Sequence, residues 1–201
     1  MCKKYKKNVE SQRNIDINKN LLLIDKKNFV IIHVNEALSQ GGRDKMAKKR
    51  NIIVGQSGGP TSVINSSLAG VYKNAIERGF DKVYGMLHGI QGLLDEQYVD
   101  LSTQIHTELD IELLKRTPSA FLGSCRFKLP EIHQDKEIYE RIFEILNKLD
   151  IYAFIYIGGN DSMDTIKKLS DYAILTGQTQ KFLGVPKTID NDLALTDHTP
   201  G

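Results

Sequence analysis

The stretch IYAFIYIGGNDSMDTIKKLSDYAI, residues 151–174, decides the fold class of this chain. Its first seven residues form a continuous apolar run, which is typical of a β-strand covered on both faces of its sheet. Two glycines follow, and then a segment with helical spacing, for which Asp161 or Ser162 is the expected N-cap. The stretch therefore predicts a strand, a glycine loop and a helix in that order.

The same order of elements recurs before and after this stretch. We expect strands at NIIVG (51–55), KVYGML (82–87) and KFLGV (181–185) and a loop at HGIQGLL (88–94). Helices are expected over IYERIFEILNKL (138–149) and, after the glycine loop QSGGP, over a segment with Val63, Leu68, Val71 and Ala75 on one face that stops at Gly79. This alternation predicts an α/β fold with a doubly wound, mainly parallel sheet, in which ligands bind at the carboxyl ends of the strands.

Composition limits the classes of protein to which the chain can belong. Of 201 residues, 40% are hydrophobic and 26% are charged, which is typical of a globular protein. No stretch approaches the ~20 apolar residues that span a bilayer, and the first ten residues lack the apolar run of a secretory signal. We therefore expect a cytoplasmic protein without a membrane partner.

Cysteine and histidine positions give no sign of a metal site. Cys2 and Cys125 lie far apart, which argues against a disulfide framework or a zinc site. His88, His133 and His198 lack metal-ligand spacing with other donors, and we interpret them as ordinary loop or surface residues.

Residues 1–45 differ from the rest of the chain in charge. They carry 10 Lys/Arg against 5 Asp/Glu, whereas residues 46–201 carry 17 against 20. The segment lacks the aromatic interleaving or arginine cluster of a nucleic-acid-binding arm, so we expect no nucleic-acid partner. It is either a disordered or strand-containing extension or the product of a mis-assigned start codon, because Met46 opens MAKKRNIIVG as a natural beginning. The domain is then expected over residues 46–201.

Two glycine loops follow predicted strands, GGP at 58–60 and GGNDS at 158–162. Glycine lets the backbone approach a ligand closely, and the N–H groups at the start of a following helix suit phosphate. The alternative is that glycine serves turn geometry only. Two such loops on one sheet favour a polyphosphate ligand.

Charged residues follow a predicted buried strand and a glycine-containing turn. TIDND places Asp190 and Asp192 two residues apart, so that in an extended segment both carboxylates face one side, although such pairs also occur as turn or capping residues. FLGSCRFK (121–128) places Arg126 and Lys128 after a glycine turn, where a guanidinium suits phosphate but is also common on a solvated surface.

Taken together, SGGPTSVIN, FLGSCRF, IGGNDS and PKTIDND resemble the phosphofructokinase family, in this order and at these separations. The similarity covers residues 50–201, and it disfavours lipid and NAD kinases, which lack a segment like TIDND. The resemblance implies Mg²⁺-dependent transfer of a phosphoryl group to the 1-hydroxyl of fructose 6-phosphate, giving fructose 1,6-bisphosphate in glycolysis.

The resemblance also implies roles for individual residues. Asp190 corresponds to the general base, and Lys187 and Asp161 to catalytic positions at the donor. Thr188, Asp190 and Asp192 correspond to the sugar site, and Asn160 stands in place of a magnesium-binding aspartate, with Asp192 as a second candidate ligand. The implied contacts with the donor phosphates are Gly58, Gly59, Arg126, Gly158, Gly159 and Ser162.

Two residues indicate which phosphoryl donor is used. Members that use ATP have glycine at the positions of Asp161 and Lys187, and members that use pyrophosphate resemble this chain. A carboxylate at Asp161 would occupy the space and charge of an ATP α-phosphate, and Lys187 can offer positive charge to the transferring phosphoryl group. We therefore favour pyrophosphate over ATP.

The sugar 6-phosphate site of the family comes largely from later parts of the chain and, in many members, from a neighbouring subunit. We therefore expect this chain to be the N-terminal portion of a homo-oligomeric enzyme, with little or no turnover alone. Two alternatives stay open, an ATP-dependent 6-phosphofructokinase and a catalytically silent fragment or regulatory phosphate-binding subunit.

Overall fold

The computed structural model describes residues 50–188, so the expected extension 1–45 and the residues Asp190 and Asp192 lie outside the described part. Strands and helices alternate along the chain, as the sequence predicts. In chain order the elements are β1 (Asn51–Gln56), α3 (Ile64–Glu77), β2 (Val83–Met86), α4 (Gly89–Leu94), β3 (Tyr98–Asp100), the 3₁₀ turn η2 (Leu101–Thr103), α5 (Glu108–Arg116), α6 (Lys136–Lys148), β4 (Ile151–Gly158), α7 (Asn160–Thr176) and β5 (Lys181–Pro186).

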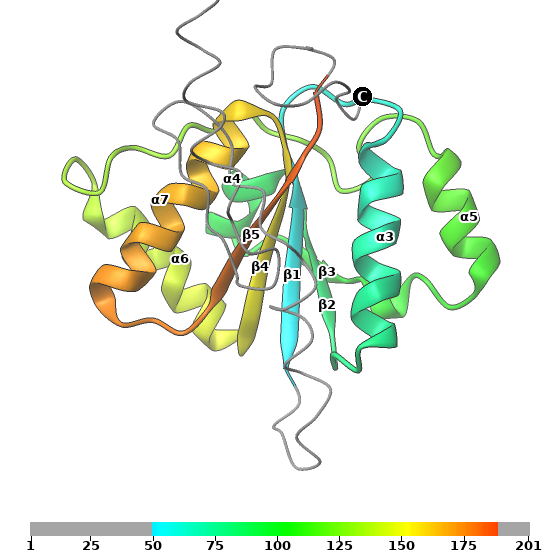
Figure 1. The fold of residues 1–201 in the computed structure, drawn as a ribbon, viewed down its shortest axis with the longest axis horizontal. Helices are drawn as coiled ribbons and strands as arrows, with labels where there is room; N and C mark the ends of the chain where they lie inside the picture. The colour runs from blue at the N-terminus through cyan, green and yellow to red at the C-terminus, as the bar shows by residue number, and fades with distance from the viewer. Residues whose placement is uncertain (1–49, 189–201) are drawn as a thin grey trace, which may run out of the picture.

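The five described strands form one sheet in the order β3-β2-β1-β4-β5. All neighbouring strands are parallel except β2 and β3, which pair antiparallel. Figure 1 shows α3 and α5 on one face of the sheet and α4, α6 and α7 on the other. The predicted α/β fold with a doubly wound, mainly parallel sheet is confirmed.

Alternate residues of the central strands pack into two separate hydrophobic layers. On β4, Ile155 and Ile157 pack in the layer of α3 and α5, whereas Phe154 and Tyr156 pack in the layer of α4, α6 and α7. Successive side chains of a strand point to opposite faces, so a strand covered on both sides needs an unbroken apolar run. Each buried aliphatic or aromatic side chain contributes about 1.5–3 kcal/mol, which makes these layers the main source of stability.

The segment HGIQGLL is a helix, so the expectation of a loop there was wrong. His88 and Gly89 have positive φ angles and turn the chain after β2, and α4 then buries its apolar side chains in the core. Its glycines concealed the helix, because glycine has low helix propensity. Gly92 is required by close packing, since a Cβ there would lie 1.6 Å from the carbonyl oxygen of Leu87.

The N-cap of α7 also differs from the expectation. The helix begins at Asn160 and its N-cap is Gly159, whereas Asp161 or Ser162 was expected. The side chain of Ser162 is buried against Ser57, so it is not placed to cap the helix.

The strand order reverses at β1: β2 and β3 lie on one side of β1, and β4 and β5 lie on the other. From β1 the chain runs to β2 on one side, and β4 later pairs with the other edge of β1. The loops after β1 and β4 therefore lead to helices on opposite faces of the sheet. A crevice at the carboxyl ends of such strands is where doubly wound proteins bind ligands.

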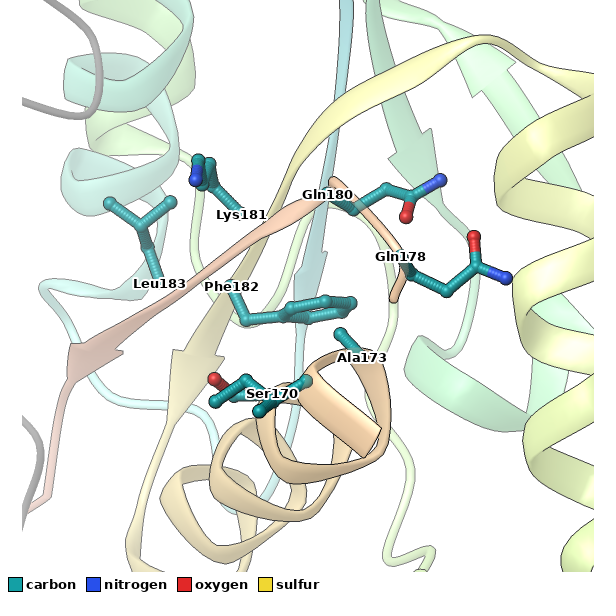
Figure 2. A pocket seen from close by; sticks show the side chains of 8 residues that line it. Ser170, Ala173, Gln178, Gln180, Lys181, Phe182 and Leu183 are labelled. Atoms are coloured by element: carbon teal, nitrogen blue, oxygen red, sulfur yellow. The ribbon is translucent and has the colours of Figure 1, made fainter. Parts of the chain in front are cut away.

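A hollow of about 290 Å³ lies away from this crevice, at the amino end of β5 (Figure 2). It is lined by Ser170, Ala173, Ile174, Gln178, Gln180, Lys181, Phe182 and Leu183. Because Lys187 follows the opposite end of β5, this hollow is separate from the candidate site. Within residues 50–188, no helix has the length and apolar character that crossing a bilayer requires.

Candidate active site

The loop after β1 is hydrogen-bonded to the segment that precedes Arg126. Gly58 has a φ of 75°, in the left-handed region that favours glycine. Its N–H donates to the carbonyl of Cys125 at 3.2 Å, and its own carbonyl accepts from the hydroxyl of Ser124. The neighbouring Gly59 is exposed, and a Cβ added there would meet no atom within 4 Å. At Gly59 this loop is therefore accessible to a ligand, whereas the backbone groups of Gly58 are hydrogen-bonded within the protein.

The loop after β4 is closely packed. The N–H of Lys187 donates to the carbonyl of Gly158 at 3.0 Å, which joins the end of β5 to this loop. The hydroxyls of Ser57 and Ser162 form a hydrogen bond beside it. A Cβ on Gly158 would lie 2.0 Å from the Oγ of Ser162 and 3.0 Å from the Oγ of Ser57. The two glycine loops thus contact each other through groups that leave no room for a side chain at position 158.

The first turn of α7 points its N–H groups toward this edge of the sheet. Gly159 caps the helix in an extended conformation and, having no side chain, provides no side-chain cap. The first four N–H groups of a helix lack intrahelical partners, and with the helix dipole they attract anions. Asn160 and Asp161 are exposed in this turn. The carboxylate of Asp161 therefore lies where a bound anion would also be stabilised.

Lys187 brings a buried positive charge to the loop after β1. The residue is 4% exposed, and its ammonium donates to the carbonyl of Gly59. A Cβ added to Gly58 would lie 3.4 Å from its Nζ. A buried ammonium requires hydrogen bonds or an opposite charge. Its position between the two glycine loops suits phosphate oxygens.

Arg126 is exposed and directly follows Cys125, whose carbonyl is bonded to Gly58. Its backbone is therefore attached beside the loop after β1, while its side chain is accessible to solvent. A guanidinium in such a place can make bidentate contacts with a phosphate. Lys128 is exposed two residues further along the chain.

The structure brings most of the predicted site residues to one edge of the sheet. Thr188 follows Lys187 there, and Asp190 and Asp192 lie outside the described residues. The predicted residues at this edge lie on loops or at the adjoining ends of β4 and α7, and they are Gly58, Gly59, Arg126, Gly158, Gly159, Asn160, Asp161, Ser162, Lys187 and Thr188.

The oxygen donors at this edge suit a magnesium ion that is also bound to phosphate. Residues 50–188 contain no group of three or more His, Cys, Asp or Glu side chains that could hold a metal by themselves. Asn160 and Asp161 offer an amide and a carboxylate oxygen at the start of α7. Mg²⁺ usually takes one or two protein ligands together with water and substrate phosphates, and this donor set fits that pattern.

Tyr156 packs beneath the site and contacts Ile90 and Cys125 through its hydroxyl. The N–H of Ile90 donates to its hydroxyl at 3.3 Å, and the Sγ of Cys125 lies 3.8 Å from the same oxygen. Burial raises the pKa of the Tyr156 phenol well above its ordinary value. The phenol is therefore neutral at physiological pH and serves packing and hydrogen bonding.

The sequence analysis missed two buried amides next to the site, Gln56 and Asn65. Gln56 ends β1 and Asn65 lies in the first turn of α3, and both are 1% exposed or less. Both could have been recognised in the sequence as polar residues at positions where the apolar periodicity of the strand and of the helix predicts a buried side chain. A buried amide must find hydrogen-bond partners, so such a residue indicates a structured neighbour.

Comparison with known proteins establishes the family. Residues 51–201 match the family described as phosphofructokinase. The chain belongs to the phosphofructokinase family. Its match covers the four motifs from which the resemblance was inferred, so that inference is confirmed.

Relatives within the family differ in the phosphoryl donor that their names give. Pyrophosphate–fructose 6-phosphate 1-phosphotransferase of Xanthomonas campestris pv. campestris is 46% identical over 151 residues, which are 75% of this chain and 35% of the relative. The crystal structure of a pyrophosphate-dependent phosphofructokinase from Nitrosospira multiformis has a TM-score of 0.66 at 39% identity, covering 74% of this chain and 36% of its own. An ATP-dependent 6-phosphofructokinase of Vibrio cholerae is 35% identical over 156 residues, 78% of this chain and 43% of the relative. The chain thus spans about a third of the length of the first two.

Proposed function

We propose that the complete protein transfers a phosphoryl group from pyrophosphate to the 1-hydroxyl of fructose 6-phosphate, giving fructose 1,6-bisphosphate and phosphate. The observation that carries this proposal is the buried ammonium of Lys187 at the Gly58–Gly59 turn, with Asp161 in the first turn of the adjoining helix. The names of the relatives from Xanthomonas campestris and Nitrosospira multiformis support it. Because the chain spans about a third of each, the activity is proposed for the complete protein.

In this reaction Asp190 takes the proton of the 1-hydroxyl as general base, a role that rests on the family resemblance. The sugar oxygen then forms a bond to the terminal phosphorus of pyrophosphate, and the bond from that phosphorus to the bridging oxygen breaks. Phosphate leaves with the electron pair of that bond. Thr188 and Asp192 belong to the sugar site in the same proposal.

The donor phosphates are held by backbone groups and two cations. Phosphoryl transfer depends on positioning and charge stabilisation more than on covalent chemistry of the protein. Lys187, whose ammonium donates to Gly59, and Arg126, which follows the Cys125 bonded to Gly58, would supply the positive charge. The proposed phosphate contacts are Gly58, Gly59, Gly158, Gly159, Ser162 and Arg126.

We further propose that the enzyme uses Mg²⁺. Asn160, with Asp192 as a second ligand, would hold the ion together with the donor phosphates. When bound, Mg²⁺ supplies positive charge that neutralises phosphate oxygens. An amide oxygen at Asn160 can ligate the ion directly or through water, although it contributes no charge.

Pyrophosphate is preferred to ATP because of the charge at Asp161. The carboxylate is exposed at the start of α7, next to the closely packed Gly158–Gly159 turn. A nucleotide would have to bring its α-phosphate to a carboxylate, which is a repulsive contact, whereas pyrophosphate ends before it.

The biological setting follows from the same proposal. The reaction belongs to glycolysis in the cytoplasm, the complete enzyme is a homo-oligomer, and neither nucleic acid nor a membrane takes part. The 201-residue chain alone is expected to show little or no turnover.

The deciding experiment measures fructose 1,6-bisphosphate formation by the purified complete protein, with pyrophosphate and with ATP, in the presence of Mg²⁺. We expect turnover with pyrophosphate and at most a trace with ATP. Turnover with ATP alone would support an ATP-dependent 6-phosphofructokinase, the second candidate, which the 35% identity to the Vibrio cholerae enzyme favours. Pyrophosphate binding without turnover would identify a silent or regulatory subunit.

A further inference from the structure

The segment between α5 and Arg126 is attached to the sheet by side chains to which the sequence analysis assigned no role. It begins at Thr117, the C-cap of α5, and passes Ser119, which has a φ of 65° that is uncommon for a residue other than glycine. Its attachment decides where the backbone of Arg126 lies. The residues responsible are Asn65 and Gln56.

Asn65 binds the first half of this segment. Its Nδ2 donates to the carbonyls of Thr117 and Ser119, each at 2.8 Å, and its Oδ1 accepts from the N–H of Phe121 at 2.9 Å. The carbonyl bond at Ser119 stabilises the unusual backbone conformation there. The side-chain amide of Asn65 thus satisfies three backbone groups of an irregular segment, as a neighbouring strand would do in a sheet.

Gln56 forms hydrogen bonds with Leu122 and with the side chain of Asn65. Its Oε1 accepts from the N–H of Leu122 at 2.9 Å, while its Nε2 donates to the Oδ1 of Asn65 at 2.9 Å and to the carbonyl of Ile64 at 3.1 Å. All four amide hydrogens of the two side chains are therefore used. Buried networks in which every group is satisfied are rigid, and losing one member leaves the others unpaired.

The same segment then contacts the loop that follows Gln56. Ser124 and Cys125 bond to the carbonyl and the N–H of Gly58, two residues after Gln56 in the chain. The segment that carries Arg126 is thus joined to the end of β1 and its following turn at two places. Gln56 bonds to Leu122, and Gly58 bonds to Ser124 and Cys125.

We propose that Gln56 and Asn65 are positioning residues for the phosphoryl donor, and that their paired amides hold the 117–125 segment against the Gly58 turn so that Arg126 faces the donor phosphates. This inference rests on the proposed function for the identity of the ligand. Neither amide contacts the reacting atoms. Their effect on the reaction passes through the backbone of residues 121–125.

The test replaces Asn65 by Asp in the complete protein. This change keeps the shape of the side chain but replaces the Nδ2 donor, so an oxygen faces the carbonyls of Thr117 and Ser119. The matched control is Asn74→Asp, an exposed asparagine on the same helix whose Nδ2 donates to the carbonyl of Gly70 at 2.9 Å. Steady-state kinetics give kcat and the KM values for pyrophosphate and fructose 6-phosphate separately.

We expect Asn65→Asp to raise the KM for pyrophosphate about tenfold or more, since small misplacements of binding groups have effects of this size. The KM for fructose 6-phosphate should stay within about twofold, and Asn74→Asp should match the unmodified protein. A fall in kcat alone, with both KM values unchanged, would mean that the amides only maintain folded protein, and it would overturn the proposal.

A second measurement does not depend on the reaction. Amide hydrogen exchange at Phe121 and Leu122 should be about tenfold faster in Asn65→Asp, with exchange in β1 and β4 unchanged. Unchanged exchange at both amides would refute the positioning role even in an active enzyme. If the unmodified protein has no activity with pyrophosphate, the proposed function fails while this measurement still decides the attachment.

Ser124→Ala covers the possibility that Asn65→Asp does not fold. It removes the hydroxyl that bonds to Gly58 from a half-buried loop position. We expect a rise of about threefold in the KM for pyrophosphate, because one neutral hydrogen bond is lost. An unchanged KM in this variant would count against the proposal.

Discussion

The two glycine loops of the site look alike in sequence but use glycine for different reasons. After β4, Gly158 lies in a packed contact, where a Cβ would reach within 2.0 Å of Ser162 Oγ. After β1, Gly59 has open space around it, and a Cβ would meet no atom within 4 Å. One loop needs glycine so that two segments of the protein can touch. The other leaves open space beside Gly59 for a ligand.

This difference assigns separate tasks to the two loops. The loop after β4 is a rigid support that places the start of α7 and receives the N–H of Lys187 at Gly158. The loop after β1 is bound from the side by Ser124 and Cys125, and its outer edge at Gly59 is accessible. Changes in the first should therefore affect stability, and changes in the second should affect donor binding.

The largest effect on stability is expected from Gly158→Ala. The added methyl group overlaps the side chain of Ser162, and overpacking of this kind costs about 1–3 kcal/mol of unfolding free energy. Denaturant titration of the complete protein measures the loss. Adding Ser162→Gly removes the overlapping atoms and should recover part of it. A stable Gly158→Ala variant would show that the loop relaxes easily, and the proposed contrast between the loops would fail.

Lys187→Met should remove activity while the protein stays folded. Methionine replaces the buried lysine with a side chain of similar length, and loss of the hydrogen bond to the carbonyl of Gly59 should cost about 1–3 kcal/mol of unfolding free energy. Loss of one group that stabilises developing charge lowers kcat by about 10²–10³-fold. Kinetics with pyrophosphate measure the effect, and circular dichroism confirms the fold. Full activity would exclude Lys187 from the donor site.

Donor choice should change in the double variant Asp161→Gly and Lys187→Gly. Removing the carboxylate removes the repulsion of an ATP α-phosphate, a contact that costs several kcal/mol, so ATP should bind at least about tenfold more tightly. Calorimetric titration with ATP measures this. The control is Asp171→Gly, on the same helix but paired with Lys167 away from the site. No gain in ATP affinity would count against Asp161 as the selectivity element.

The smallest effect is expected from Gly59→Ala. The site has room for a methyl group and its φ does not require glycine, so the unfolding free energy should change by less than about 0.5 kcal/mol. The KM for pyrophosphate should rise a few fold if the ligand lies against this backbone. A large destabilisation would show that the loop after β1 is packed as tightly as the loop after β4.

The fold could be predicted because its signal is local. The apolar run at 151–157 and the stripe at 138–149 each reflect neighbours within one element, and the structure confirms both. The helix α4 was missed because its glycines satisfy tertiary contacts against the local preference, as Gly89 shows, where a Cβ would lie 2.6 Å from the phenolic oxygen of Tyr156. The N-cap of α7 was misplaced for a similar reason, since Ser162 packs against Ser57.

The sequence by itself determined the alternation of strands and helices, the two glycine loops and the family to which the motifs belong. Only the tertiary structure showed that Lys187 reaches Gly59, 128 residues earlier in the chain, and that Gln56 binds Leu122. Periodicity and turn chemistry depend on residues a few positions apart. Contacts at the edge of a sheet depend on strand order and register, which place distant segments together and which no single segment encodes.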